Sequence, residues 1–172
     1  MPPARLCGII PCRESQTCSV PHRLDGMSNR PNEHALARFA QRYAAQWNEP
    51  DPALRRKEIE DIWAPDGAQV LIDPPQEIQD AATNLAFPAP TLAVLGHDAL
   101  AARVTRAYEM FVEPGEFRFE TRGATALPGG RAQLTWVMVT VSDGAIVGGG
   151  FDIVTFDGDG RIKLNHQFIG LD

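Results

Sequence analysis

The spacing of apolar residues changes once along this chain, and that change limits the folds open to it. Up to about residue 111, apolar residues recur at intervals of three and four, the period of a helix. From Phe117 onward they alternate with polar residues, the period of a half-buried strand. Helices first and strands later are typical of α+β folds. We therefore predict a curved antiparallel sheet with three N-terminal-half helices packed on it, forming a cone with an apolar pocket.

Three helices are predicted in the first two thirds of the chain. The first spans Glu33 to Trp47, and the second spans about Pro52 to Trp63, with a proline near its start. The third opens at Gly96, and Asp98 suits its cap or its first turn. Each helix has one apolar stripe to bury, and that of the third helix consists of Leu100, Val104, Ala107, Tyr108 and Phe111.

Five strands are predicted, and the last four follow one another directly. A short buried strand at Ala68–Ile72 comes first, and residues 76–95 are given no structure beyond a short helix at about 78–85. Gly148 to Gly150 lie inside a later strand, where they favour a bulge or a bend. Turns separate the later strands, which we expect to form an antiparallel meander: Phe117–Thr121, Arg131–Ser142, Ile146–Phe156 and Arg161–Phe168.

Residues 33–172 are predicted to form one cone-shaped domain, and residues 1–32 an unstructured leader. The leader contains five prolines and no sustained periodicity. Its three cysteines, Cys7, Cys12 and Cys18, have spacings that match neither a zinc site nor a redox motif. Met27 lies shortly before the first helix, so a natural start at Met27 is an alternative. Mass spectrometry of the native N-terminus tests it.

The charge and the apolar pattern exclude several kinds of partner. A formal net charge of -6 leaves no basic field for a phosphate backbone, so no nucleic acid partner is expected. No apolar run approaches the ~18 residues that span a bilayer, and no clear secretion signal occurs, so we expect a cytoplasmic protein without a membrane partner. The four histidines lack metal-ligand spacing and no phosphate-binding glycine loop occurs, so neither a metal nor a cofactor is predicted.

Tyr43, Asp73 and Asp152 are polar residues at positions that would otherwise be apolar. Tyr43 lies in the stripe of the first helix, so its hydroxyl needs a partner or a ligand. Asp152 alternates with Val154 and Phe156, and burial there disfavours the charged form of its carboxyl group. Asp73 ends the first strand, where turn chemistry before two prolines is a sufficient structural reason for an aspartate. All three are candidate catalytic residues that also have a structural interpretation.

Five further residues are candidates for lining a ligand pocket. His166 and Phe168 share one face of the last strand, and we expect that face to be directed at the cavity. Trp63, Trp136 and Met138 complete the predicted lining. The alternative is that these side chains pack the core and fill the hollow.

Three segments carry a resemblance to a known fold family. They are Arg42–Asn48, Ile62–Gly67 with Val70–Pro74, and Phe151–Ile162. Together they resemble the nuclear transport factor 2-like superfamily, and within it the SnoaL-like and ketosteroid isomerase-like proteins. The resemblance covers roughly residues 33–169.

The resemblance implies a role for each polar candidate. In ketosteroid isomerases, a tyrosine of the first helix and a protonated aspartic acid on a late strand donate hydrogen bonds to a developing oxyanion. An aspartate after the first strand moves the proton. By motif position, the resemblance assigns these roles to Tyr43, Asp152 and Asp73.

Two functions stay open from the sequence. The first is a cofactor-independent isomerase or lyase that uses carboxylate acid/base chemistry on a lipophilic carbonyl or hydroxyl compound, as an isomerase, cyclase or dehydratase with Asp73 as the base. The second is a non-catalytic ligand-binding or dimerisation module, because relatives often dimerise through the open sheet face, and a homodimer is expected. Convergence of Tyr43, Asp73 and Asp152 on one cavity would favour the enzyme.

Overall fold

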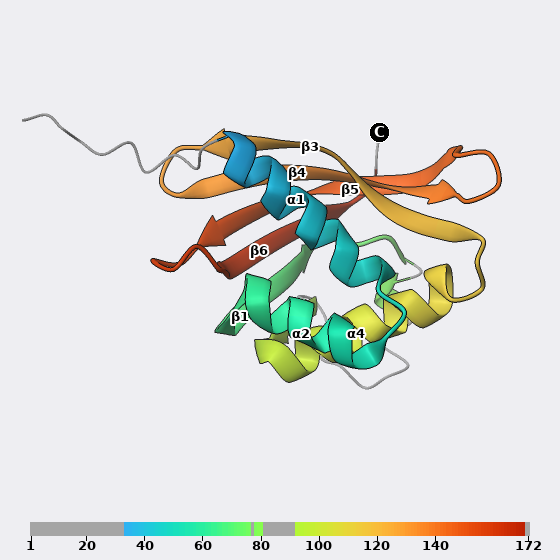
Figure 1. The fold of residues 1–172 in the computed structure, drawn as a ribbon, viewed down its shortest axis with the longest axis horizontal. Helices are drawn as coiled ribbons and strands as arrows, with labels where there is room; N and C mark the ends of the chain where they lie inside the picture. The colour runs from blue at the N-terminus through green and yellow to red at the C-terminus, as the bar shows by residue number, and fades with distance from the viewer. Residues whose placement is uncertain (1–32, 77, 81–91, 171–172) are drawn as a thin grey trace, which may run out of the picture.

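The structure is a computed structural model that describes residues 33–76, 78–80 and 92–170 (Figure 1). The predicted leader, with its cysteines and the alternative start at Met27, lies outside the described residues. So does most of the connection between the first strand and the third helix. At the beginning of that connection, residues 76 and 78–80 are helical.

The three predicted helices are present. α1 spans Glu33–Asn48, α2 spans Pro52–Ile62, and α4 spans Gly96–Ala107 and continues as η1, Tyr108–Val112. The apolar stripe of α1 faces inward, with Leu36, Ala40, Tyr43 and Trp47 all buried. None of the helices in the described part of the chain is both long and apolar enough to span a bilayer.

The start of α4 differs in detail from the sequence prediction. Asp98 lies in the first turn of the helix, but its carboxylate is exposed and pairs with Arg56 of α2 at 2.7 Å. Leu95 occupies the cap position and makes no side-chain cap bond. Asp98 therefore links two helices on the surface rather than closing the end of one.

Asp51 is the residue that caps α2. Its Oδ1 accepts hydrogen bonds from the backbone N–H groups of Ala53 at 2.7 Å and Leu54 at 3.1 Å. We expect Asp51→Ala to lower the free energy of unfolding by about 1 kcal/mol, because two helix N–H groups lose their acceptor. Denaturant unfolding checks this, with Asp51→Asn as the control that keeps an acceptor oxygen. An equal loss in both variants would contradict the capping role.

A six-stranded mixed sheet carries the helices. Its strand order is β2-β1-β6-β5-β4-β3. The predicted meander is confirmed, because β3 to β6 pair antiparallel in sequence, whereas β1 pairs parallel with β6. The strand bounds are Trp63–Ile72 (β1), Leu92–Leu95 (β2), Phe117–Leu127 (β3), Arg131–Thr140 (β4), Ile146–Phe156 (β5) and Ile162–Ile169 (β6).

Two of the strands are irregular. β1 begins at Trp63 rather than at the predicted Ala68, because Asp66 and Gly67 lie within the strand, where its register against β6 shifts. In β5, the register against β4 shifts between Met138 and Val139, opposite the start of the glycine run. The irregularity predicted from that run is therefore present.

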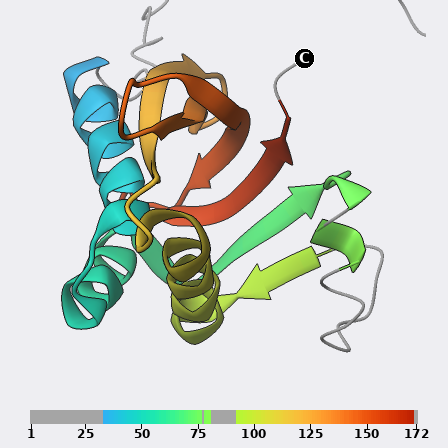
Figure 2. The same cartoon turned by 90° about the vertical axis from the view of Figure 1, so that its right-hand side faces the viewer.

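The helices lie on one side of the sheet, which curves around them (Figure 2). α1 runs across the strands of the meander and packs against β3, while α2 and α4 lie beside β1 (Figure 1). Between these layers lies a core of buried side chains, among them Ile59, Trp63, Leu100, Val104, Leu134, Val154 and Ile162. This arrangement confirms the α+β class with N-terminal-half helices on a curved, open sheet.

Candidate functional site

Tyr43 of α1 and Asp152 of β5 meet in the core. The Tyr43 hydroxyl donates to Asp152 Oδ2 at 2.5 Å. Tyr43 is 2% exposed and Asp152 is fully buried, so water does not compete for this bond. The partner that an inward tyrosine needs is thus an acid 109 positions away in the sequence.

Two further donors reach the same carboxyl group. Asn165 Nδ2 lies 2.8 Å from the Tyr43 hydroxyl oxygen and 3.3 Å from Asp152 Oδ2. Trp136 Nε1 donates to Asp152 Oδ1 at 3.3 Å. Both carboxyl oxygens of Asp152 are therefore engaged, and the group is held in one orientation.

Burial changes the acidity of both partners. Loss of hydration raises the pKa of Asp152 from 3.8 to about 6, and the hydrogen bonds from Tyr43, Asn165 and Trp136 limit the rise because they favour the carboxylate. Burial also raises the pKa of Tyr43 well above its ordinary value, and the Asp152 charge adds to this. Burial thus favours the protonated forms of both Asp152 and Tyr43.

Strand register explains why these groups face the helices. Asp152 pairs with Leu134 on one side and Gln167 on the other, and Gln167 pairs with Leu71. Directly paired residues project from the same face of a sheet, and Leu71 and Leu134 are core residues there. The next row contains Gln69 and Asn165, which also pair directly. Each of two neighbouring rows therefore contributes a pair of buried polar side chains on the helix-covered face, Gln167 with Asp152 and Gln69 with Asn165.

Arg103 of α4 covers the β1 end of these two rows. Its Nε donates to Gln69 Oε1 at 2.6 Å, and its Nη2 donates to Gln167 Oε1 at 2.5 Å. The Gln167 side chain in turn donates toward Asp152 and favours its charged form. Arg103, Gln69, Gln167, Asp152, Asn165 and Tyr43 form one connected group, which we call the interior polar cluster.

Two atoms of the cluster have no hydrogen-bond partner among the described residues. They are Gln69 Nε2, a donor, and Asn165 Oδ1, an acceptor. Both side chains are fully buried. Because buried polar groups in folded proteins are nearly always paired, each of these atoms calls for a physical explanation.

Aromatic side chains surround the Tyr43 end of the cluster. The Trp63 ring lies 6.4 Å from that of Tyr43, and its Nε1 donates to Gln46. Phe119 lies between Trp47 and Trp136, with ring centroids 6.1 Å from each. The cluster is therefore polar at its centre and aromatic around it, rather than a purely apolar hollow.

A glycine makes room for one of these rings. Gly150 pairs directly with Trp136 across β4 and β5. A Cβ atom at Gly150 would lie 2.9 Å from Trp136 Cζ2 and would overlap the carbonyl oxygen of Phe168. The absence of a side chain here lets the indole lie against β5 and reach Asp152.

Asp73 lies apart from the cluster. It is exposed, follows the end of β1, and has a positive φ of 45°. Leu71, two residues earlier, belongs to the row of Gln167 and Asp152. The structure thus brings Tyr43 and Asp152 into contact in the core, and leaves Asp73 exposed beyond the end of β1.

The left-handed backbone at Asp73 makes a prediction about stability. Aspartate and asparagine tolerate this conformation better than other residues with a side chain. We expect Asp73→Ala to lower the free energy of unfolding by about 1 kcal/mol and Asp73→Asn to leave it nearly unchanged. Denaturant unfolding of the two variants measures the difference. Equal stabilities would show that the turn does not depend on this residue type.

His166 and Phe168 lie on the other face of the sheet. His166 pairs with Ile153, and Phe168 pairs and stacks with Phe151 at 4.5 Å between ring centroids. All four alternate with the residues of the interior polar cluster, so they point away from it. The structure therefore does not place His166 and Phe168 around the same space as Tyr43 and Asp152. Of the other predicted lining residues, Trp63 and Trp136 contact the cluster, and Met138 follows Trp136 on the same face.

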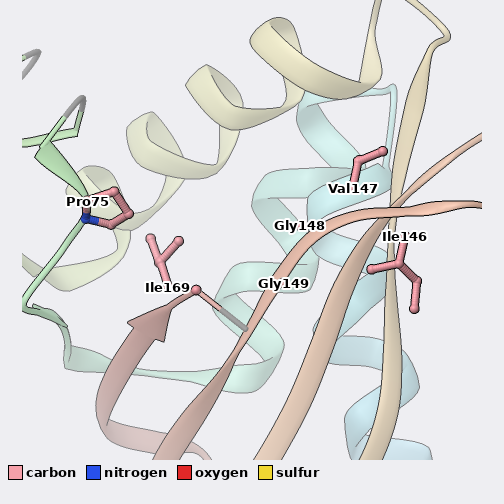
Figure 3. Close-up of a pocket in the computed structure, with 7 residues that line it drawn as sticks. Pro75, Ile146, Val147, Gly148, Gly149 and Ile169 are labelled. Atoms are coloured by element: carbon pink, nitrogen blue, oxygen red, sulfur yellow. The ribbon is translucent and has the colours of Figure 1, made fainter. Parts of the chain in front are cut away.

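An open pocket of about 360 Å³ lies at the start of β5 and the end of β6 (Figure 3). It is largely apolar and is lined by Pro75, Ile146, Val147, Gly148, Gly149, Ile169 and Gly170. None of the predicted lining residues belongs to it. Pro75 follows Asp73 by two residues, so the pocket lies next to the Asp73 turn rather than at the cluster.

The described residues offer little for a metal ion. No three His, Cys, Asp or Glu side chains within residues 33–76, 78–80 and 92–170 come together as a ligand set. What the cluster provides is hydrogen-bond donors, one acid with a raised pKa, and one cation.

Arg103, Gln69, Asn165 and Gln167 are site candidates that the sequence prediction missed. Arg103 stands three residues after Leu100, beside the buried stripe of α4, and that spacing was the available signal. Asn165 and Gln167 alternate with His166 and Phe168, whose face was the one predicted to be directed at the cavity. Gln69 lies inside a strand whose other residues are mostly apolar.

Comparisons with known proteins bear on the fold. No protein-family profile and no curated protein matches the sequence. A protein of the SnoaL-like family from Agrobacterium tumefaciens, assigned as a candidate isomerase, is 26% identical, with a TM-score of 0.60 over 79% of this chain and 97% of its own. A SnoaL-like protein from Burkholderia thailandensis is 16% identical, with a TM-score of 0.51 over 78% of this chain and 97% of its own. A nuclear transport factor 2-like protein from an Exiguobacterium species is 14% identical, with a TM-score of 0.53 over 78% and 98%.

The helices on a curved, open six-stranded sheet and these likenesses define the class: this chain has the nuclear transport factor 2-like fold. Within that class, its solved neighbours include SnoaL-like proteins, as the sequence resemblance implied. The fold supports a ligand-binding or isomerase-type role.

Proposed function

We propose that the protein binds a small lipophilic carbonyl compound beside the interior polar cluster and transfers a proton on it, as an isomerase-type enzyme. The observation that carries this proposal is the fully buried Asp152 carboxyl, held by three donors, with a pKa raised to about 6. A carboxyl group with this pKa can give up or accept a proton near neutral pH. The candidate isomerase assignment of the Agrobacterium protein agrees with this reaction type.

Each polar residue then has a distinct role in the proposal. Asp152 exchanges the proton or donates a hydrogen bond to a developing oxyanion. Tyr43 and Asn165 orient Asp152, since their hydrogen bonds are already made to it. Asp73, exposed after the end of β1, is the candidate second base. Trp63, Trp136 and Met138 are the proposed apolar contacts of the ligand.

A two-stage experiment tests the proposal. A thermal-shift screen of steroid-like, terpenoid and polyketide-like ketones first identifies a chemical class that stabilises the protein. NMR in D₂O then follows exchange of the acidic C–H next to the carbonyl of each stabilising ketone. We expect the wild type to catalyse this exchange and Asp152→Asn to slow it by about 100-fold or more, because general acid/base groups contribute that much.

Two further variants interpret the result. Asp73→Asn tests the second base, and a similar loss would place Asp73 in the reaction. Asp98→Asn is the matched control, because that acid is exposed and pairs with Arg56 on the surface. Stabilisation by a ketone without any exchange in the wild type would favour the alternative, a non-catalytic ligand-binding or dimerisation module. The cytoplasmic location and the homodimer remain predictions.

A further inference from the structure

Arg103 is a cation without a carboxylate partner on the inner side of α4. Its two side-chain hydrogen bonds go to the neutral amide oxygens of Gln69 and Gln167. Among the described residues, no ion pair includes its guanidinium. Burial lowers the pKa of Arg103, while the charge of the Asp152 carboxylate opposes this. The guanidinium is thus partly dehydrated and not neutralised by direct contact.

Gln69 brings a donor without a partner next to this cation. A guanidinium has five N–H groups, and the bonds to the two glutamines occupy Nε and one hydrogen of Nη2. Gln69 Nε2 is a buried donor with no partner among the described residues. The Gln69 amide cannot be flipped to give Nε2 a partner, because its Oε1 accepts the hydrogen bond from Arg103 Nε. The unpartnered donor Gln69 Nε2 therefore belongs to the same amide group that accepts from Arg103 Nε.

The surroundings of these donors fix the kind of group that fits. A site with several N–H donors and a positive charge needs an acceptor that carries no hydrogen, and a planar carboxylate has two such oxygens. Arg103 also lies over the Trp47 ring at 5.8 Å, and Trp47 packs against Phe119. An anion bound here would place the rest of its molecule against aromatic side chains.

We propose that Arg103 and Gln69 bind the carboxylate of an apolar organic acid, so that the ligand of the interior site is an anion rather than a neutral ketone alone. This inference rests on the proposed function, because it takes the same interior as the ligand site. Arg103 becomes a specificity-determining residue. Gln167 connects Arg103 to Asp152, because its side chain interacts with both.

Binding of matched acids and amides tests this inference. The probes are 4-phenylbutanoate and cyclohexylacetate, each compared with its primary amide, which has nearly the same shape but no charge. Calorimetric titration at pH 7.5 should give Kd values about tenfold or more lower for the acids with the wild type. Arg103→Met should bind acid and amide equally, with the amide Kd within about twofold of the wild-type value. Gln69→Leu should lose part of the preference for the acid.

One readout needs no variant and keeps the test decisive if Arg103→Met does not fold. Addition of 4-phenylbutanoate to the wild type should shift the NMR signals of the Gln69 side-chain amide protons, and the amide probe should not. Equal Kd values for acid and amide, a preference that survives in Arg103→Met, or failure of all four probes to bind would overturn the inference.

The inference and the proposed function fail in different ways. Amides that bind as well as the acids, with exchange lost in Asp152→Asn, would remove the anion site and leave the enzyme. Acid binding that depends on Arg103, without any proton exchange on stabilising ketones, would remove catalysis and leave an organic-acid carrier.

Discussion

The stability of the wild type should fall between pH 4 and pH 6 relative to that of Asp152→Asn. The folded-state pKa of Asp152 is about 6, against an ordinary value of 3.8. The folded state therefore keeps a proton that the unfolded state releases in this window. A group with a raised pKa contributes stability that is complete below the unfolded pKa and is lost as the pH rises through the folded pKa. The separation of the two pKa values, 3.8 and about 6, corresponds to about 3 kcal/mol.

Denaturant unfolding at several pH values measures this effect. The difference in unfolding free energy between the wild type and Asp152→Asn should change by about 2.5 kcal/mol from pH 4 to pH 7 and then level off. Asp157→Asn is the control, because backbone hydrogen bonds lower the pKa of Asp157 and move its window below 3.8. Its difference from the wild type should stay constant over the same range. A flat curve for Asp152→Asn would show that the buried carboxyl titrates normally.

Gly150→Ala should be among the most destabilising single-methyl additions in the sheet. The new Cβ would overlap the Phe168 carbonyl oxygen and press on Trp136. Because the first clash is with backbone, β5 and β6 must separate locally to accept it. Overpacking of this kind costs about 3 kcal/mol. We expect that loss in denaturant unfolding, with a change in near-ultraviolet circular dichroism as the Trp136 indole moves.

Gly148→Ala is the matched control two residues earlier on the same strand. Its Cβ would meet only the Met138 methyl carbon, at 3.7 Å, an ordinary contact. We expect a change of at most about 0.5 kcal/mol, in line with surface substitutions that disturb no special feature. Similar losses in both alanine variants would mean that strand flexibility, rather than the close approach at Gly150, sets the cost.

The sequence was sufficient to predict the helices and strands whose apolar residues follow a regular spacing within the element itself. α1 follows from its apolar stripe, and the meander of β3 to β6 follows from alternation between turns. β2 was missed because Leu92–Leu95 is only four residues long and half exposed, which leaves no pattern to distinguish it from a loop. The parallel pairing of β1 with β6 joins segments that are far apart in the sequence. It could not be predicted, because the residues of neither strand indicate which strand it pairs with.

The candidate site was predictable only where a residue broke an apolar pattern. Tyr43 and Asp152 did so, and the structure brings them into contact. Alternation in β6 separates two faces but does not say which one meets the helices, so His166 and Phe168 were assigned to the interior in place of Asn165 and Gln167. Arg103 resembled an ordinary surface charge, because its role depends on two strands that pass beneath α4.

The parallel pairing of β1 with β6 also bears on how the protein assembles. β1 ends at Ile72, and its partner begins at Ile162, so this pairing closes a long loop, and we expect it to form late in folding. The meander is made of neighbouring segments, and we expect it to form earlier. Tyr43 and Asn165 are 122 positions apart in the sequence, so the hydrogen bond between them cannot form before β6 has been synthesised. A nascent chain stalled before β6 emerges should therefore expose α1 and β1 to chaperones and proteases, and synthesis of β6 should end that exposure.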